Sequence, residues 1–296
     1  MKIEWPTVAL IAMTYAVWAF AGALVWPVNP VLALLMLTLC TAMHSSLVHE
    51  NLHGHPTRKR RVNEALVAVN LGLLYPYRRY RESHLRHHND VRLTDPFEDP
   101  ETYYRAAWMH RTMPPWLRGL LAANNTMLGR MVLGPWLGSA AFLWQELHAV
   151  VNNAPGVRRA WLMNIVGCVP VIVALIHWGI PVWLYVVTAI WGAQSLIAIR
   201  TYAEHQWHER PDGRTIIVER SPLSLLFLNN NLHIVHHKLP RAPWYDLPRL
   251  YHQRRPEWHA INDGYVYPNY RALWRDHALH AKEPVEHPVL HRSRAP

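Results

Sequence analysis

The chain has 296 residues, and 30 Lys and Arg against 20 Asp and Glu give it a formal net charge of +10. Hydrophobic residues make up 51% and charged residues only 17%, which excludes a disordered chain and does not fit an ordinary soluble domain. Histidines number 21, and the two cysteines, Cys40 and Cys168, lie in apolar stretches. Two such cysteines exclude an iron–sulfur cluster, a Cys-x-x-Cys site and a disulfide framework, but a site made of histidines stays open.

Two long uncharged blocks predict membrane spans. No Asp, Glu, Lys or Arg occurs at 5–48 or at 160–199, and a short turn containing proline divides each block, at 26–30 and 179–181. We therefore expect four spans in two hairpins, at 8–25, 31–48, 161–178 and 182–199. Each has 18 residues and reaches roughly 27 Å, close to the ~30 Å hydrocarbon core of a bilayer. Four full-length uncharged helices are hard to place in the core of a soluble protein, which is the alternative.

The basic residues predict the orientation in the membrane. Every Lys and Arg is Lys2, lies within 58–159, or follows from Arg200 onward. The positive-inside rule places both termini and the middle segment in the cytoplasm, in a bacterial inner or ER-type membrane. We expect an all-α, integral-membrane protein with a single domain, 1–296, whose helical cytoplasmic cap comprises 49–160 and 200–296. Interrupted apolar segments at 63–75 and 116–150 predict helices on the membrane surface. Since orientation explains the basic charge, we expect no nucleic-acid partner.

Four short segments outside the spans hold eleven of the histidines. They are His49-Glu50-Asn51-Leu52-His53-Gly54-His55, His84-Leu85-Arg86-His87-His88, Glu204-His205-Gln206-Trp207-His208 and His233-Ile234-Val235-His236-His237. Residues three and four apart share a helix face, so each box of this spacing points several imidazoles the same way. Charged imidazoles so close together would repel, which favours neutral rings bound to metal. The other histidines stand alone, and we expect no metal role for them: His44, His110, His148, His177, His252, His259, His277, His280, His287 and His291.

The first segment also contains a zinc-protease motif. His49, Glu50 and His53 form His-Glu-x-x-His, in which the histidines would bind zinc and Glu50 would act as general base. One catalytic zinc needs three protein ligands and a water molecule. That number would leave six or more clustered histidines without a role, so an intramembrane zinc protease is the weaker alternative.

The order HxxxH, HxxHH and HxxHH, combined with two apolar hairpins, resembles the membrane fatty acid desaturase and hydroxylase superfamily. The resemblance spans nearly the whole chain and implies a non-haem di-iron centre that uses O2 as co-substrate. Carried over by position, the nine implied iron ligands are His49, His53, His84, His87, His88, His205, His233, His236 and His237. No catalytic residue beyond these metal ligands is expected.

Further residues are candidates to support the ligands. Asn229 lies four residues before His233, on the same face of an expected helix, where some family members have a water-mediated asparagine ligand. His55 and His208 fit the pattern less clearly and are expected to act around the ligands. Asp95 and Asp99 could orient ligand imidazoles or could form turns beside proline, and the sequence leaves both open.

The resemblance implies a fatty acyl desaturase that introduces a double bond into an apolar chain entering from the bilayer. A hydroxylase, a carotenoid-type ketolase or an alkane-type monooxygenase would use the same site and is the alternative. The sequence has no rubredoxin-like cysteine cluster, no flavin-binding GxGxxG and no His-Pro-Gly-Gly of a fused cytochrome b5. The resemblance implies that a separate ferredoxin, rubredoxin or cytochrome, with its reductase, delivers the electrons.

Overall fold

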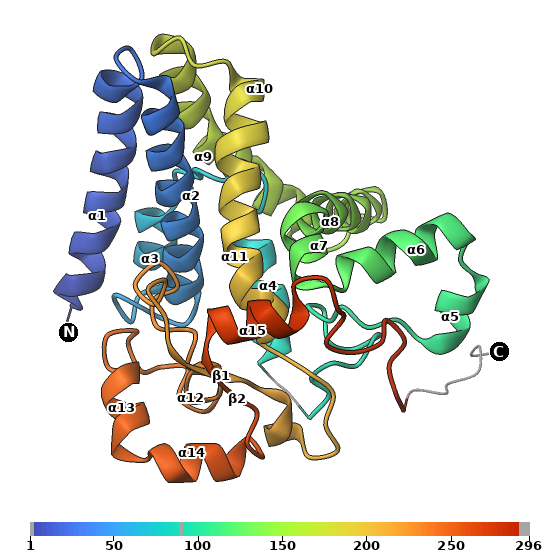
Figure 1. Ribbon diagram of the computed structural model, residues 1–296. Helices are drawn as coiled ribbons and strands as arrows, with labels where there is room; N and C mark the ends of the chain where they lie inside the picture. The colour runs from blue at the N-terminus through green and yellow to red at the C-terminus, as the bar shows by residue number, and fades with distance from the viewer. Residues whose placement is uncertain (1–2, 89–90, 290–296) are drawn as a thin grey trace. The chain divides into compact units, whose positions relative to one another are not determined.

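The computed structural model describes residues 3–88 and 91–289, and these are mostly helical (Figure 1). His291 lies outside the described residues. Backbone contacts divide the chain into two compact units. The first comprises Met1–Arg81, Trp136–Ile197 and Leu226–Leu228, and the second Glu82–Pro135, Ala198–Leu225 and Asn229–Pro296. Each unit is described by itself below.

Four helices are long and apolar enough to cross a membrane: Trp5–Val25, Pro30–Leu52, Val157–His177 and Val182–Ala203. The prediction of four apolar helices is confirmed. Most of the helices extend beyond the predicted spans, because backbone hydrogen bonding continues where the apolar surface stops. His49 and Glu50 thus lie within the second helix, and Arg158 and Arg159 within the third.

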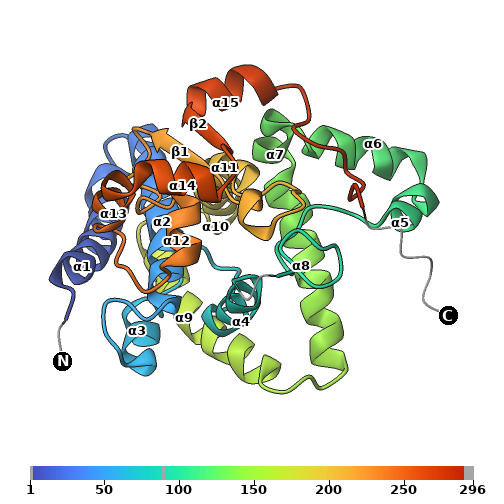
Figure 2. The ribbon, with the colours of Figure 1, turned by 90° about the horizontal axis from the view of Figure 1, so that it is seen from below.

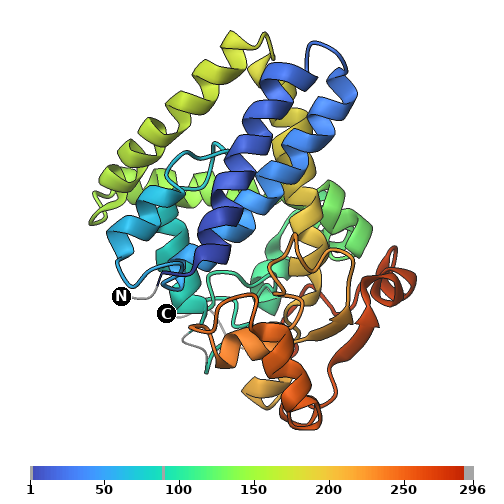
Figure 3. The ribbon, with the colours of Figure 1, turned by 90° about the vertical axis from the view of Figure 1, so that its left-hand side faces the viewer.

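The first unit is built around two helices that lie side by side, as Figures 1 and 3 show. The first of them, α1 (Trp5–Phe20), continues into a π-helical turn, η1 (Ala21–Val25), and the second is α2 (Pro30–Leu52). Proline begins α2, and the Asn29 side chain accepts a hydrogen bond from Leu32 N at 3.0 Å, which caps its first turn. The other helices with residues in this unit are α3 (Arg60–Leu66), α4 (Tyr77–His87), α8 (Gly134–Val151), α9 (Val157–His177), α10 (Val182–Tyr185), η2 (Val186–Ile190) and α11 (Trp191–Ala203).

A non-helical segment, residues 67–76, packs inside the first unit, so the predicted helix at 63–75 is wrong beyond Leu66. Leu71 at its centre is fully buried in the apolar core. Side chains of the long apolar helices satisfy its carbonyl groups: Tyr15 Oη donates to Val69 O and Tyr185 Oη to Leu71 O, both at 2.9 Å. Backbone groups buried among apolar side chains need such partners, and here helices supply them from outside the segment.

The second unit combines short helices with two parallel strands, β1 (Ile217–Arg220) and β2 (Val266–Asn269). Ile217 pairs with Val266 and Val218 with Tyr267. Figure 2 shows the helices α12, α13 and α14 gathered near these strands. Besides the ends of α4, α8 and α11, the helices of this unit are α5 (Ala107–Thr112), α6 (Pro115–Asn124), α7 (Met127–Val132), η3 (Pro211–Arg214), α12 (His233–Lys238), α13 (Leu247–Gln253), α14 (Arg255–Ile261) and α15 (Tyr270–His277).

The core of the second unit positions the third histidine box. Ile234 and Val235 of α12 are buried among apolar side chains of β1, α13 and α14. Burial of this pair anchors α12, the helix that carries His233, His236 and His237, on the apolar core of the unit.

Candidate metal centre

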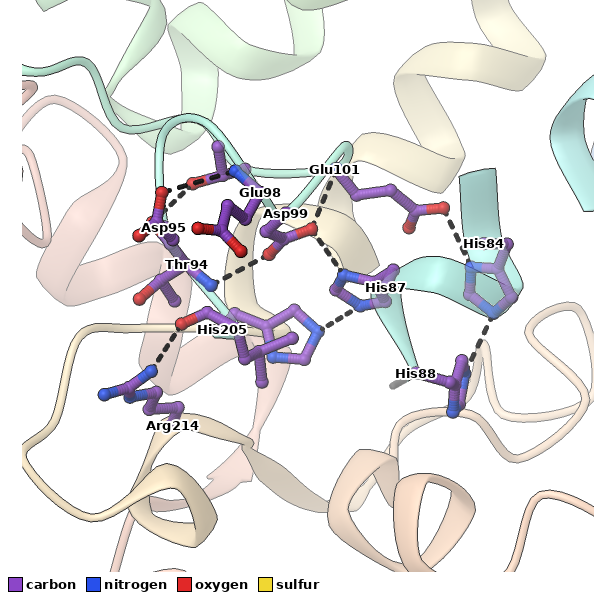
Figure 4. Close-up of polar contacts among 12 residues, drawn as sticks. His84, His87, His88, Thr94, Asp95, Glu98, Asp99, Glu101, His205 and Arg214 are labelled. Atoms are coloured by element: carbon purple, nitrogen blue, oxygen red, sulfur yellow. Dashed lines mark hydrogen bonds and ion pairs between the residues drawn. The ribbon is translucent and has the colours of Figure 1, made fainter. Parts of the chain in front are cut away.

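Four histidines of the second unit converge on one point: His87, His205, His233 and His237. They come from the last residue of α4, the segment after α11, and both ends of the box on α12. One ring nitrogen of each lies within 4.8 Å of the corresponding nitrogen of the others. His205 Nε2 is 3.0 Å from His87 Nε2 and 3.1 Å from His233 Nε2 (Figure 4 shows the first contact). His237 Nε2 is 3.2 Å from His233 Nε2.

In two of these histidines, His87 and His233, the opposite ring nitrogen meets a hydrogen-bond acceptor. His87 Nδ1 lies 2.8 Å from Asp99 Oδ1 (Figure 4), and His233 Nδ1 lies 2.9 Å from Asn230 Oδ1. Glu204 Oε1 is also 3.5 Å from His233 Nδ1. An acceptor at Nδ1 holds a proton there, so Nε2 is the ring nitrogen that can bind a metal at the centre of the cluster.

This arrangement fits a bound metal ion. His205 Nε2 lies within 3.1 Å of two other Nε2 atoms, and a ring nitrogen, which carries either one proton or one lone pair, can form a hydrogen bond with only one of them. A cation at the centre would bind all four lone pairs, and imidazole suits iron, zinc and copper. Two nitrogens that bind one metal at about 2.1 Å and at right angles are about 3.0 Å apart, which matches the observed separations.

A second group of histidines adjoins the first within the same unit. His84 Nε2 is 3.0 Å from His88 Nε2, and the rings of His88 and His236 lie 4.9 Å apart. Figure 4 shows His84 Nδ1 directed at Glu101 Oε1, 2.9 Å away. His88 also stacks on His237 at 4.1 Å between ring centroids, which connects the two groups. The second unit thus holds seven of the nine predicted ligands.

The other two predicted ligands lie in the first unit. His49 is in the last turns of α2, and His53 follows that helix directly as its C-cap residue. Their ring centroids are 5.0 Å apart, so the four-residue spacing does place both imidazoles together.

Most of the converging rings are neutral. Burial lowers the pKa of His205, His233 and His237 well below its usual value, and neighbouring imidazoles lower it further. Burial also lowers the pKa of His87, but the charges of Glu101 and Asp99 outweigh it and raise that pKa to about 9. Three neutral ligands are therefore ready to bind metal, and a metal ion would displace a proton from His87.

The two predicted aspartates differ. Asp99 binds His87 and also accepts hydrogen bonds from the backbone N–H groups of Thr94 and Glu101, at 2.8 and 2.9 Å. Asp95 accepts from Phe97 N at 2.8 Å, which is turn geometry beside proline. Asp99 thus lies where an orienting carboxylate is needed, whereas Asp95 shapes the loop.

Three other predicted residues lie elsewhere. The expected helical face shared by Asn229 and His233 is wrong, because α12 begins only at His233 and Asn229 has a φ of 56°. Asn229 Nδ2 donates to Trp244 O at 3.0 Å. His55 Nδ1 is 2.8 Å from the Glu4 carboxylate, and His208 Nε2 is 3.0 Å from Asp263 Oδ2, so each ring has a carboxylate partner.

Sequence reasoning missed three partners of the clustered imidazoles, namely Glu101, Glu204 and Asn230. Glu204 directly precedes His205, and Asn230 lies three residues before His233, so polar residues next to the boxes were an available signal. Glu101 follows its box by more than a dozen residues, and only the loop between them brings it to His84.

The comparisons with known proteins agree with the histidine pattern. The family model described as "Fatty acid desaturase" matches residues 24–269, which include every clustered histidine. A comparison with curated proteins finds no match. The matched region covers most of the chain, and the chain therefore belongs to the fatty acid desaturase family.

Proposed function

We propose that this protein is an O2-dependent di-iron desaturase that introduces a double bond into the acyl chain of a lipid. The convergence of His87, His205, His233 and His237, with acceptors at the Nδ1 atoms of His87 and His233, carries the proposal. Four ring nitrogens that point at one position can all bind one metal ion, whereas they cannot all form hydrogen bonds with one another.

The family pattern supplies the remaining assignments. His84, His88 and His236 would bind the second iron, and the family's first box assigns His49 and His53 to the same centre. Asn229 remains a predicted ligand that would bind an iron through a water molecule. When bound, the irons would supply the reduction of O2 that removal of hydrogen from an unactivated methylene requires. The chain's own part is to fix the ligand tautomers, through Asp99, Glu101 and Asn230.

The wider arrangement is also proposed on the strength of the charge pattern and the family. The four apolar helices would cross the membrane as two hairpins, with both termini and the histidine centre on the cytoplasmic side. The two compact units would act as one desaturase domain. A separate ferredoxin, rubredoxin or cytochrome would deliver the electrons, and the acyl chain would enter from the bilayer.

Two alternatives predict different measurements. An HExxH zinc protease would use His49 and His53, but the seven clustered histidines of the second unit would have no role in it. A hydroxylase or a carotenoid-type ketolase shares the iron site and differs only in its product.

Metal analysis and product analysis test the proposal. Protein purified in detergent is expected to contain two irons per chain, whereas one zinc without iron would support the protease. The protein is expressed in a host that lacks the gene, and the host's lipids are analysed by mass spectrometry. The product is expected to contain two hydrogens fewer than its substrate. A gain of oxygen would instead identify a hydroxylase or ketolase.

A further inference from the structure

The second unit contains a polar pocket beside the histidine cluster. Its cavity volume is about 80 Å³, which is room for a small polar group. The lining residues used below are Tyr103, Arg130, Tyr202, His205, Lys282 and Glu283. Tyr103 is about half exposed, so the pocket is open to solvent on that side.

Arg130 is the unusual residue of this pocket. Its side chain is buried, with only 4% of the residue exposed, and its guanidinium carbon lies 3.4 Å from the centre of the Tyr103 ring. Nε donates to Asn124 O at 3.0 Å, but Nη1 is buried without a hydrogen-bond acceptor. No carboxylate forms an ion pair with Arg130 among the residues that the structure describes. A buried guanidinium without a counter-charge is costly, which indicates a missing anionic partner.

The surroundings add positive charge. Burial lowers the pKa of Arg105, and the charge of Arg130 lowers it further. Burial also lowers the pKa of Lys282, to about 8, where Glu283 opposes the shift and the charge of Arg130 adds to it. Lys282 Nζ donates to His205 O at 2.7 Å, so this ammonium group is held at the pocket wall.

The carboxylates of the pocket do not neutralise Arg130, because each has another partner. Asp99 binds His87, Glu101 binds His84, Glu204 binds Arg200, and Glu283 accepts a hydrogen bond from the Trp207 backbone N–H. Glu283 is also 4.0 Å from Lys282, which leaves Arg130 as the cation of the pocket without an acidic partner.

We infer that the pocket binds an oxyanion, a carboxylate or a phosphate group, against the guanidinium of Arg130. A planar guanidinium binds two oxygens of such a group at once, and the pocket is large enough for one. The oxyanion comes either from a free inorganic anion or from the head of an acyl chain. The second source rests on the proposed function, and the first does not.

Calorimetric titration of the detergent-purified, iron-loaded full chain tests this inference, with inorganic phosphate and octanoate as separate probes. We expect at least one probe to bind, and the variant Arg130→Met to weaken that binding at least tenfold. Arg130→Lys keeps the charge but loses the planar fork, so we expect an intermediate loss. The matched control is Arg118→Met, which removes an exposed arginine of α6 and is expected to leave the affinity unchanged.

The outcomes separate the possible sources and the proposed function. Binding of octanoate alone identifies the carboxylate head of an acyl chain as the source, and binding of inorganic phosphate, alone or together with octanoate, identifies a free inorganic anion. The inference is overturned if neither probe binds the parent protein, or if both Arg130 variants bind as tightly as it does; if Arg130→Met does not fold, Arg130→Lys alone decides. Iron content is measured in the same samples and tests the di-iron proposal independently, because the Arg130 site needs no metal.

Discussion

The hydrogen-bond partner of Nδ1 determines whether the other ring nitrogen of a clustered imidazole, Nε2, can act as a metal ligand. Asp99 and Asn230 accept from the Nδ1 atoms of His87 and His233, and Glu101 faces Nδ1 of His84. Each contact favours the tautomer whose Nε2 is a metal ligand. A histidine of these boxes therefore works as a pair with its acceptor, and both members can be tested.

Removal of one converging imidazole should remove metal. We expect His233→Ala to lower the iron content of the purified protein by at least half, because His233 Nε2 lies next to those of both His205 and His237. The protein should stay in the membrane fraction, since the apolar helices are unchanged. His252→Ala, at an exposed position of α13, is the control and should keep its iron. Equal iron in the two variants would contradict the division into clustered and isolated histidines.

The two aspartates of the loop before α5 offer a matched comparison. Asp99→Asn keeps the shape of the side chain but removes the negative charge at His87 Nδ1, and the loss of such a partner typically costs 10–100-fold in metal affinity. Asp95→Asn changes only a turn and should leave the affinity within about twofold. Competition with an iron chelator measures both. A similar loss in both variants would mean that loop structure, and not the contact with His87, controls the metal.

The clustering of the boxed histidines was predictable from the sequence, and most of their hydrogen-bond partners were not. Spacings of three and four residues place imidazoles on one helix face, which His84 and His88 satisfy directly. Glu101 depends on the path of an irregular loop, for which the sequence has no periodic signal. The spacing of four residues between Asn229 and His233 does not place them on one helix face, because α12 begins only at His233 and the backbone of Asn229 is left-handed.

At the scale of elements, uncharged runs predicted the four long apolar helices, but apolar character alone misassigned residues 67–76. An apolar segment without regular periodicity is compatible with a helix or with any other buried conformation. Its actual conformation depends on donors from distant helices, such as Tyr15 and Tyr185, and on the close approach of Gly167. Such contacts between distant segments are invisible to a local reading of the sequence.

Gly167 allows this segment to approach α9. A Cβ at this position would lie 2.0 Å from Ala68 O, a backbone atom, whereas a Cβ at Gly138 of α8 would meet nothing within 4 Å. We expect Gly167→Ala to destabilise the protein by about 1–3 kcal/mol through overpacking. Gly138→Ala should be neutral or stabilise by up to about 1 kcal/mol, because alanine favours helix. Unfolding in detergent compares them, and equal stability would show that the segment does not pack against α9 as described.

For the whole molecule, the sequence predicts which side of the membrane each loop faces, because orientation depends on the distribution of Lys and Arg and not on the fold. Val28, in the turn between the first two apolar helices, is 84% exposed, and Leu279, after α15, is 70% exposed. The native thiols of Cys40 and Cys168 are buried, so they should contribute little background to a labelling experiment.

Val28→Cys and Leu279→Cys therefore report on the two sides of the membrane. In intact cells, a membrane-impermeant maleimide should label Val28→Cys, because no basic residue holds that turn in the cytoplasm. Leu279→Cys should react only after the membrane is permeabilised, since its segment follows many basic residues. The unsubstituted chain measures the background of the native thiols. Reaction of Leu279→Cys in intact cells would place the segment after α15 outside and would reverse the proposed orientation of the hairpins.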